Sequence, residues 1–347
     1  MVRGKLFAAV LGGVAIAAVA CGGSDSGGGS SAPPATVAGS DAGGGGDRDA
    51  ASSSDAGAGL DSGAPGEDAG PDPVFASKLY VLPQTSYPVT RIGDAIEALL
   101  AARPTLDNVI VFVHGRACGG GGEPDKSLGS VVPEMESDYG AGVVMFYWPG
   151  SDKGCPLGFP EDESRAAGPA LRAMLQRMNA HMASHPGTRA KIKTSLLTHS
   201  MGNIVLEEAL ATKTGLAPAL FDDVVLNSSA TALAAHAAWL SRLDFATDVY
   251  VTVNGGDSVL LAAGTGRGVR LGRDLGTEAL TPRAAYVDFT AAGVNHQYYV
   301  SSGQKGQHMR DFYQAVLNGR PYDLAGSPAI TKRTVRDGAT VHTFDGK

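Results

Sequence analysis

The sequence predicts an α/β fold in which a mostly parallel central sheet is covered by helices on both faces. Short apolar, β-rich runs alternate with helical stretches over residues 74–347, and these 274 residues are enough for one large domain. The runs near residues 109, 143, 194, 223, 249 and 285 are apolar on both faces. A parallel sheet buried between two helix layers requires that pattern.

The helix expected after residue 148 shows the helical period most clearly. Its apolar residues recur at intervals of three and four, so we expect them to pack on the sheet as core and not to hold a cofactor. They are Leu171, Met174, Leu175, Met178 and Met182.

The turn at Ser200 is the strongest chemical motif of the chain. In the segment LLTHSMGN (residues 196–203), an apolar strand ends in a small-x-Ser-x-Gly turn and continues into a helix-forming stretch at residues 204–211. This layout is that of a nucleophile elbow, which lifts a serine hydroxyl clear of the sheet and presents it to a base. Gly202 would let the helix pass close to the strand. The alternative is an ordinary strand-to-helix junction rich in small residues. The presence or absence of a base, an acid and an oxyanion loop elsewhere in the sequence decides between the two interpretations.

An upstream strand leads into a loop suited to stabilising an oxyanion. Residues 108–113 form an apolar run that is followed by His114, Gly115 and Arg116. In a serine hydrolase site, an N–H group of this loop and the N–H group after the nucleophile donate to the oxyanion. The expected donors are the backbone N–H groups of Arg116 and Met201.

The acid and the base are expected after two later strands. Asp257 follows the strand at residues 248–254, and His296 comes six residues after the strand at residues 285–290. The chain order serine, acid, histidine is that of α/β-hydrolases and differs from the orders in the chymotrypsin and subtilisin folds. His308 is the alternative base, but it opens an apparent helix at residues 309–317. His296 is closer to the strand and is preferred.

Three other acids compete with Asp257. Asp222, Asp223 and Asp248 precede their strands, so a parallel sheet would place them at the opposite edge as ordinary turn residues. The strand that ends at Asn227 has no acid after it. Asp257 is also placed to cap the helix expected at residues 258–263, and this role is compatible with that of the catalytic acid.

The remaining motifs favour neither a metal nor a cofactor. The glycines at residues 264–268 follow a short helix and not a strand, so they indicate a turn and not a dinucleotide site. The run Gly119 to Gly122 indicates a mobile loop, with a backbone nest near the active site as the alternative. The sequence has no HExxH and no paired CxxC motif, so we expect no metal site.

The first 20 residues have the features of a secretory signal peptide. Arg3 and Lys5 precede an apolar stretch at residues 6–20, and small residues lead to Cys21. The segment AVAC (residues 18–21) resembles a bacterial lipoprotein box, although Ala18 stands where leucine is usual. We therefore expect an extracytoplasmic protein anchored in the membrane through a lipidated Cys21. An ordinary signal-peptidase site, and hence secretion, is the alternative.

Residues 21–73 are expected to form a disordered tether. They are almost entirely Gly, Ser, Ala, Asp and Pro, too poor in large apolar side chains to fold. They carry nine acidic residues against one arginine, a net charge of −8, whereas residues 74–347 carry −1. Because the domain is nearly neutral, a nucleic-acid partner is not expected. The acidic tether would hold the domain away from an anionic surface.

Two cysteines remain if Cys21 is lipidated, and cysteines outside the cytoplasm tend to pair. Cys118 lies three residues after Gly115, and Cys155 follows the strand at residues 143–148. In the usual strand order of this fold, both loops lie at one edge of the sheet. A Cys118–Cys155 disulfide that holds the oxyanion loop is our hypothesis.

Four segments together resemble a bacterial family of α/β-hydrolases whose function is unassigned. They are VFVHG (111–115), THSMGN (198–203), DSVL (257–260) with RLG (270–272), and NHQYY (295–299), and the similarity spans roughly residues 105–318. The resemblance implies Ser200, Asp257 and His296 as the catalytic triad. Two positions depart from the family pattern. Thr198 replaces the first glycine of the elbow, and Arg116 stands where an aromatic residue is often found, which would bring a positive charge beside the acyl site.

These residues predict a serine hydrolase that needs no cofactor and acts on a small-molecule or lipid carboxylic ester. Only about twenty residues separate the strands near residues 227 and 249, where lids are commonly inserted, so we expect no large lid. An amidase or peptidase would use the same constellation. A non-catalytic, lipid-anchored binding module is the rival from a different class, because function does not follow from fold. The sequence predicts no oligomeric state.

Overall fold

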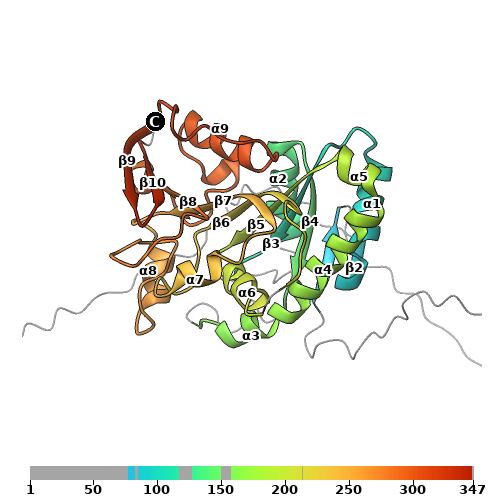
Figure 1. Cartoon of the computed structure of the whole chain (residues 1–347), viewed down its shortest axis with the longest axis horizontal. Helices are drawn as coiled ribbons and strands as arrows, with labels where there is room; N and C mark the ends of the chain where they lie inside the picture. The colour runs from blue at the N-terminus through green and yellow to red at the C-terminus, as the bar shows by residue number, and fades with distance from the viewer. Residues whose placement is uncertain (1–76, 83–84, 117–126, 150–157, 213, 346–347) are drawn as a thin grey trace, which may run out of the picture. The chain divides into compact units, whose positions relative to one another are not determined.

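Ten strands of the computed structural model form one sheet (Figure 1). The structure describes residues 77–82, 85–116, 127–149, 158–212 and 214–345. The order across the sheet is β2-β1-β4-β3-β5-β6-β7-β8-β10-β9. Along the chain the strands are β1 (Lys78–Val81), β2 (Thr85–Pro88), β3 (Asn108–Val113), β4 (Gly142–Tyr147), β5 (Lys193–His199), β6 (Phe221–Asn227), β7 (Ala246–Val253), β8 (Ala285–Asp288), β9 (Ile330–Arg336) and β10 (Ala339–Phe344).

The centre of the sheet is parallel. Strands β4, β3, β5, β6, β7, β8 and β10 pair parallel, while the β1–β2, β1–β4 and β9–β10 pairs are antiparallel. The carboxyl ends of parallel strands meet at one edge of a sheet, and sites in open α/β sheets lie outside that edge. The loops after β3, β5, β6, β7 and β8 therefore converge on one region.

Helices cover both faces of the sheet, with α2 and α9 above it and α6 and α7 below it in Figure 1. The described helices are α1 (Ile92–Ala102), α2 (Val132–Tyr139), α3 (Glu161–Ala166), α4 (Gly168–Ser184), α5 (Pro186–Lys191), α6 (Gly202–Ala209), α7 (His236–Leu240), α8 (Ser258–Gly264) and α9 (Gln307–Val316). Single turns of other helix types lie at Val89–Arg91, Ser127–Val131, Thr290–Ala292 and Ser301–Gly303.

Alternate residues of each central strand enter two separate cores. In β3, Val109 and Val111 pack with residues of α1, α4 and α6, whereas Ile110 and Phe112 pack with residues of α2 and α9. All four side chains are buried, which confirms the predicted parallel sheet between two helix layers.

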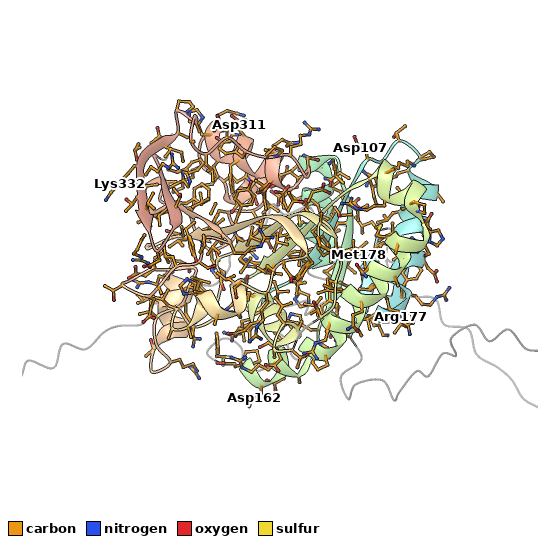
Figure 2. The ribbon with its side chains drawn as sticks, viewed as in Figure 1. Asp107, Asp162, Arg177, Met178, Asp311 and Lys332 are labelled. Atoms are coloured by element: carbon orange, nitrogen blue, oxygen red, sulfur yellow. The ribbon has the colours of Figure 1, made fainter. Side chains whose placement is uncertain are left out.

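The periodic residues of α4 are core, as their spacing predicts. Met174, Met178 and Met182 are buried in the same cluster as β3, β5 and β6. Figure 2 shows Met178 directed toward the sheet and Arg177 directed away from it. Helical spacing thus identified the buried face correctly.

Strands β1, β2 and β9, toward the two sides of the sheet, lack the pattern of apolar residues on both faces. The sequence analysis therefore did not predict them. β1 and β2 have four residues each, and β2 has no buried residue. β9 has five exposed residues between two half-buried ends, Ile330 and Arg336. Edge strands need only one buried face or none, and charged side chains protect them from pairing with other chains. Their sequences therefore do not read as buried strands.

The connection between β6 and β7 is short, as predicted. It spans residues 228–245 and contains a single five-residue helix, α7. The expectation that no large lid is inserted between these two strands is confirmed.

Candidate active site

Ser200 occupies a sharp turn between β5 and α6. Its φ is 51°, a left-handed conformation that a residue with a β-carbon adopts at a cost. The turn is held from both sides, because the Ser200 N–H group donates to the Asn227 carbonyl at 3.0 Å and the Ser200 carbonyl accepts from the Ala230 N–H group at 3.1 Å. This geometry is that of a nucleophile elbow and disfavours a plain strand-to-helix junction.

The strain at Ser200 can be measured. We expect Ser200→Gly to be more stable than Ser200→Ala by about 1 kcal/mol, because glycine adopts positive φ without steric cost. Urea denaturation of the two variants measures this difference in stability. Because both variants lack the serine hydroxyl, the difference reports the backbone strain alone. Equal stability would contradict a strained turn.

Gly202 allows the elbow to form. A β-carbon at Gly202 would overlap the Val113 carbonyl oxygen and would lie 2.7 Å from the His114 carbonyl oxygen. Both obstacles are backbone atoms of the neighbouring β3 segment, so they cannot move aside as a flexible side chain could. Helix α6 can therefore begin directly behind Ser200 only with glycine at this position.

Thr198 stands where the elbow usually has a glycine, and its side chain forms a hydrogen bond that glycine could not form. Its hydroxyl donates to the Asn203 side-chain oxygen at 2.7 Å. The Asn203 amide group in turn donates to the carbonyls of Ser200 at 3.0 Å and Asn227 at 3.2 Å. The threonine thus orients a buried asparagine that ties the elbow to the end of β6.

Gly115 brings the oxyanion loop against the nucleophile. A β-carbon at Gly115 would lie 2.8 Å from the Ser200 β-carbon, so the two backbones are in close contact. Arg116 follows Gly115, and Met201 lies at the N-cap of α6. Both predicted oxyanion donors therefore belong to segments that flank Ser200.

His114 fixes the loop that leads to Gly115. Its Nδ1 lies 2.7 Å from the Gly115 carbonyl, its Nε2 lies 3.2 Å from the Trp148 backbone nitrogen, and its carbonyl accepts from the Trp148 indole at 2.8 Å. Nδ1 is therefore the protonated nitrogen and Nε2 the acceptor. Burial lowers the pKa of His114 to about 4, against an opposing effect of the Gly115 hydrogen bond, so the ring is neutral at neutral pH.

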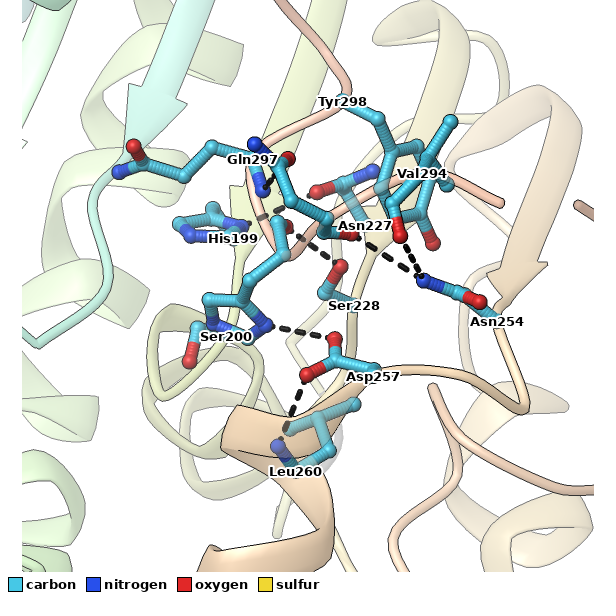
Figure 3. Close-up of polar contacts among 12 residues, drawn as sticks. His199, Ser200, Asn227, Ser228, Asn254, Asp257, Leu260, Val294, Gln297 and Tyr298 are labelled. Atoms are coloured by element: carbon cyan, nitrogen blue, oxygen red, sulfur yellow. Dashed lines mark hydrogen bonds and ion pairs between the residues drawn. The ribbon is translucent and has the colours of Figure 1, made fainter. Parts of the chain in front are cut away.

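Asp257 and His296 form a buried acid–base pair (Figure 3). The Asp257 Oδ2 lies 2.7 Å from the His296 Nδ1, and the two side chains are 0% and 14% exposed. Asp257 Oδ1 accepts from the Leu260 N–H group at 2.9 Å and so caps α8. The two roles considered for Asp257 therefore coexist. With Nδ1 donating to the carboxylate, Nε2 of His296 is the basic nitrogen.

Ser228 connects the nucleophile loop to the base. Its neighbours Asn227 and Ala230 bond the backbone of Ser200, and its own hydroxyl donates to the His296 carbonyl at 2.8 Å. Ser228 has a φ of 44°, a second strained non-glycine residue at the same edge. Figure 3 draws Ser200 in the same close-up as the ring bonded to Asp257, and the ring of His199, the residue before Ser200, lies 4.7 Å from that of His296. The structure thus brings all three predicted residues together.

His199 packs a second imidazole against the base. Its ring centre lies 4.7 Å from that of His296, and its Nδ1 is 3.0 Å from the Asn227 side-chain oxygen. Burial lowers the pKa of His199 well below its ordinary value, and the nearby His296 lowers it further. A neutral ring at this position puts no second positive charge beside His296 at neutral pH.

The alternative residues lie elsewhere. His308 is half-buried in the first turn of α9, as its helical interpretation predicted, and the Asp257 Oδ2 contacts His296. Asp222 accepts from the Thr194 N–H group at 2.8 Å and pairs with Lys193 at the amino-terminal ends of the strands. Asp248 lies near the start of β7, also at that edge.

The expectation that these three acids precede their strands was wrong, because Asp222 and Asp223 lie inside β6 and Asp248 lies inside β7. Asp223 is 1% exposed in β6, and its Oδ1 has no hydrogen-bond partner among the residues that the structure describes. Burial, with a further contribution from the carboxylates of Asp248 and Asp222 and an opposing one from Lys193, raises the pKa of Asp223 to about 8. The side chain is therefore largely protonated at neutral pH.

This raised pKa predicts a pH-dependent stability. Since the folded-state pKa of about 8 exceeds the ordinary value of 3.8, the stability contribution of Asp223 is complete below the ordinary value and is lost as the pH rises through 8. We expect Asp223→Asn to become increasingly more stable than the wild type as the pH rises. Thermal unfolding over a pH series tests this. A difference in melting temperature that stays constant across the series would be inconsistent with it.

Sequence reasoning missed three residues that organise the site: Asn227, Ser228 and Asn254. Asn227 ends β6 and Asn254 follows β7. A buried amide at the carboxyl end of an apolar parallel strand is the signal that could have indicated them, because such residues face the edge where sites form.

The segment Arg270–Leu271–Gly272, noted only for its resemblance, joins two site loops. The Gly272 N–H group donates to the Ser229 carbonyl at 2.9 Å, and the Gly272 carbonyl accepts from the Asn254 N–H group at 2.9 Å. A β-carbon at Gly272 would overlap the backbone of residues 228 and 229. This glycine therefore permits the loops after β6 and β7 to approach each other.

Several predictions concern residues outside the described part of the chain. These are the signal peptide and tether (residues 1–73), Cys21, the glycine run at residues 119–122, and the two cysteines of the disulfide hypothesis, Cys118 and Cys155. Within the part that the structure describes, no helix is long and apolar enough to cross a membrane. No group of three His, Cys, Asp or Glu side chains there is arranged to hold a metal ion.

Comparison with known proteins finds similarity only among solved structures. No protein-family model matches the chain, and no curated protein matches it. A hyperthermophilic esterase from the archaeon Pyrobaculum calidifontis aligns at 15% identity over 61% of this chain and 75% of its own, with a TM-score of 0.33. Carboxyl esterase 2 from the fungus Tuber melanosporum aligns at 14% identity over 74% and 90%, with a TM-score of 0.38.

At these identities and TM-scores, the fold assignment depends on the chain's own geometry. A central parallel sheet with helices on both faces, a strained serine between β5 and α6, and an acid and a histidine in the loops after β7 and β8 define the α/β-hydrolase fold. The chain has this fold.

Proposed function

We propose that the protein is a serine hydrolase that cleaves carboxylic esters through Ser200, His296 and Asp257. The observation that supports it most is the 2.7 Å contact between the buried Asp257 carboxylate and the His296 Nδ1, beside a serine in a strained elbow. A non-catalytic module has no need to store this strain or to bury a charged acceptor behind an imidazole.

The chemistry follows from the orientation of His296. Its Nε2 takes the proton of the Ser200 hydroxyl as the serine oxygen attacks the ester carbonyl carbon. The carbonyl oxygen becomes an oxyanion and accepts hydrogen bonds from the N–H groups of Arg116 and Met201. His296 then protonates the departing alcohol, which leaves an acyl group on Ser200.

Water completes the reaction. His296 removes a proton from the water as the water oxygen attacks the acyl carbon, and it returns that proton to the Ser200 oxygen as the acid is released. Asp257 keeps its charge throughout and stabilises the imidazolium that forms twice per cycle. The cycle consumes one ester and one water and needs no cofactor.

Of the two substrate classes that this triad could cleave, we propose an ester, because an alcohol leaves more readily than an amine, whose nitrogen must first be protonated. The test uses para-nitrophenyl acetate, butyrate and octanoate beside para-nitroacetanilide, with His296→Ala as the control. We expect the wild type to hydrolyse the esters and the variant to lose that activity. Comparable cleavage of the anilide would favour an amidase, and no hydrolysis by folded protein would favour a binding module.

We also propose, from the sequence, that Cys21 is lipidated, that residues 22–73 tether the domain outside the cytoplasm, and that Cys118 and Cys155 form a disulfide. Mass spectrometry of the membrane fraction should find a mature protein that begins at an acylated Cys21, and Cys21→Ala should abolish the acylation. A mature protein in the soluble fraction would contradict the anchor.

The disulfide has a separate test. Two free thiols, at Cys118 and Cys155, counted without reductant would contradict it.

A further inference from the structure

Asn254 lies between the loop of the acid and the loop of the base. It follows directly after β7, three residues before Asp257, and its side chain is 0% exposed. The chain segment that approaches it is residues 294–295, immediately before His296. One buried amide therefore contacts both loops.

Every polar group of the Asn254 side chain is used in this position (Figure 3). Its Nδ2 donates to the carbonyls of Val294 at 3.0 Å and Asn295 at 3.1 Å. Its Oδ1 accepts from the Gly256 N–H group at 3.0 Å, and its main-chain carbonyl accepts from the Asp257 N–H group at 3.0 Å. The two donor hydrogens hold the base loop, while the two acceptors hold the acid loop.

We propose that Asn254 is a positioning residue that sets the distance between the Asp257 carboxylate and the His296 imidazole. The proposal deepens the proposed function, because it explains how two separate loops keep a 2.7 Å contact. Two further contacts support this arrangement: Ser228 holds the His296 carbonyl from the β6 loop, and the Thr290 hydroxyl, farther from His296 along the base loop, accepts from the Gly255 N–H group of the acid loop at 2.7 Å. Asn254 joins the residues next to the base directly to the residues next to the acid.

Only a side-chain amide can both donate to the two carbonyls of the base loop and accept from the Gly256 N–H group, as Asn254 does. A carboxylate at this position would keep the acceptor for Gly256 but would face the Val294 and Asn295 carbonyls with a second acceptor. The buried Val294 carbonyl and the partly buried Asn295 carbonyl would then lose their donor and be repelled. The base loop is expected to move away, and displacement of about 1 Å at a catalytic group can lower the rate about 100-fold.

A matched control is available at the opposite edge of the sheet. Asn108 is 2% exposed at the start of β3, and its Nδ2 donates to the Leu317 carbonyl at 2.7 Å. It resembles Asn254 in burial and in bonding a carbonyl, but it holds the end of α9 and not a catalytic loop. A purely structural role would make Asn254→Ala and Asn108→Ala behave alike.

The experiment compares Asn254→Asp, Asn254→Ala and Asn108→Ala in the protein otherwise unchanged. The readouts are kcat and KM for para-nitrophenyl butyrate, stability in urea, and the low-field proton NMR signal of the His296 Nδ1–H group, assigned with His296→Gln. We expect both Asn254 variants to lower kcat about 10- to 100-fold with little change in KM and to shift or broaden the signal. Asn108→Ala should lower stability only.

The proposal is overturned if Asn254→Ala keeps both kcat and the signal, if Asn108→Ala lowers kcat equally, or if folded wild type lacks the low-field signal. If the wild type hydrolyses no ester, the proposed function fails on its own. The NMR comparison still tests the positioning role, because the signal reports the Asp257–His296 contact without turnover. Should Asn254→Asp fail to fold, the alanine variant gives the same comparison.

Discussion

Replacing Ser200 with alanine is expected to lower kcat/KM for ester hydrolysis by about 10⁵-fold or more, the largest effect of any single change in this protein. The hydroxyl oxygen forms the covalent bond to the acyl group, and no other side chain at the elbow can replace it. Alanine keeps the β-carbon and the strained backbone, so stability should change little. Initial rates with para-nitrophenyl butyrate at matched protein concentrations measure the effect.

Any activity that remains in Ser200→Ala must be shown not to depend on His296. The double variant Ser200→Ala with His296→Ala should be no slower than the single variant, since the base has no nucleophile left to activate. If Ser200→Ala retains a rate within about tenfold of the wild type, another residue is the nucleophile and the proposed mechanism is wrong.

Asp257→Asn is expected to lower kcat/KM by about 10⁴-fold while leaving the fold intact. The asparagine oxygen can still accept from the Leu260 N–H group and cap α8, as Asp257 Oδ1 does at 2.9 Å. Its amide group then faces the His296 Nδ1 and favours the tautomer with the proton on Nε2. That nitrogen can no longer take the serine proton.

The matched comparison is Asp257→Ala, which removes the cap as well. Losing an N-cap costs about 1 kcal/mol, so the alanine variant should be less stable in urea than the asparagine variant while being equally inactive. An Asp257→Asn protein with near-normal kcat would show that a different acid orients His296.

The central strands and the order of the triad could be predicted from the sequence because their causes are local. Residues 109–113 are apolar on both faces, and that pattern alone requires burial between two layers. Ser200 could be found because a strand, a small-residue turn and a helix follow one another within a few residues. Asp257 and His296 then followed from their places after later strands.

The residues that align these groups could not be predicted, because their partners are distant in the sequence. Asn254 bonds carbonyls 40 and 41 positions away, and Ser228 bonds one 68 positions away. Neither residue type is unusual after a strand. The left-handed backbone of Ser228 likewise lies against Gly272, which is distant in the sequence. The charged edge strand β9 has too little buried surface to produce a recognisable pattern.

Whether Ser200 is an activated nucleophile is tested most directly by intact-mass analysis after reaction with a fluorophosphonate probe, with Ser200→Ala beside the wild type. We predict one probe adduct per wild-type molecule, located on the peptide that contains Ser200, and none on the variant. Folded wild-type protein that remains unlabelled, or an adduct that persists in Ser200→Ala, would contradict the account.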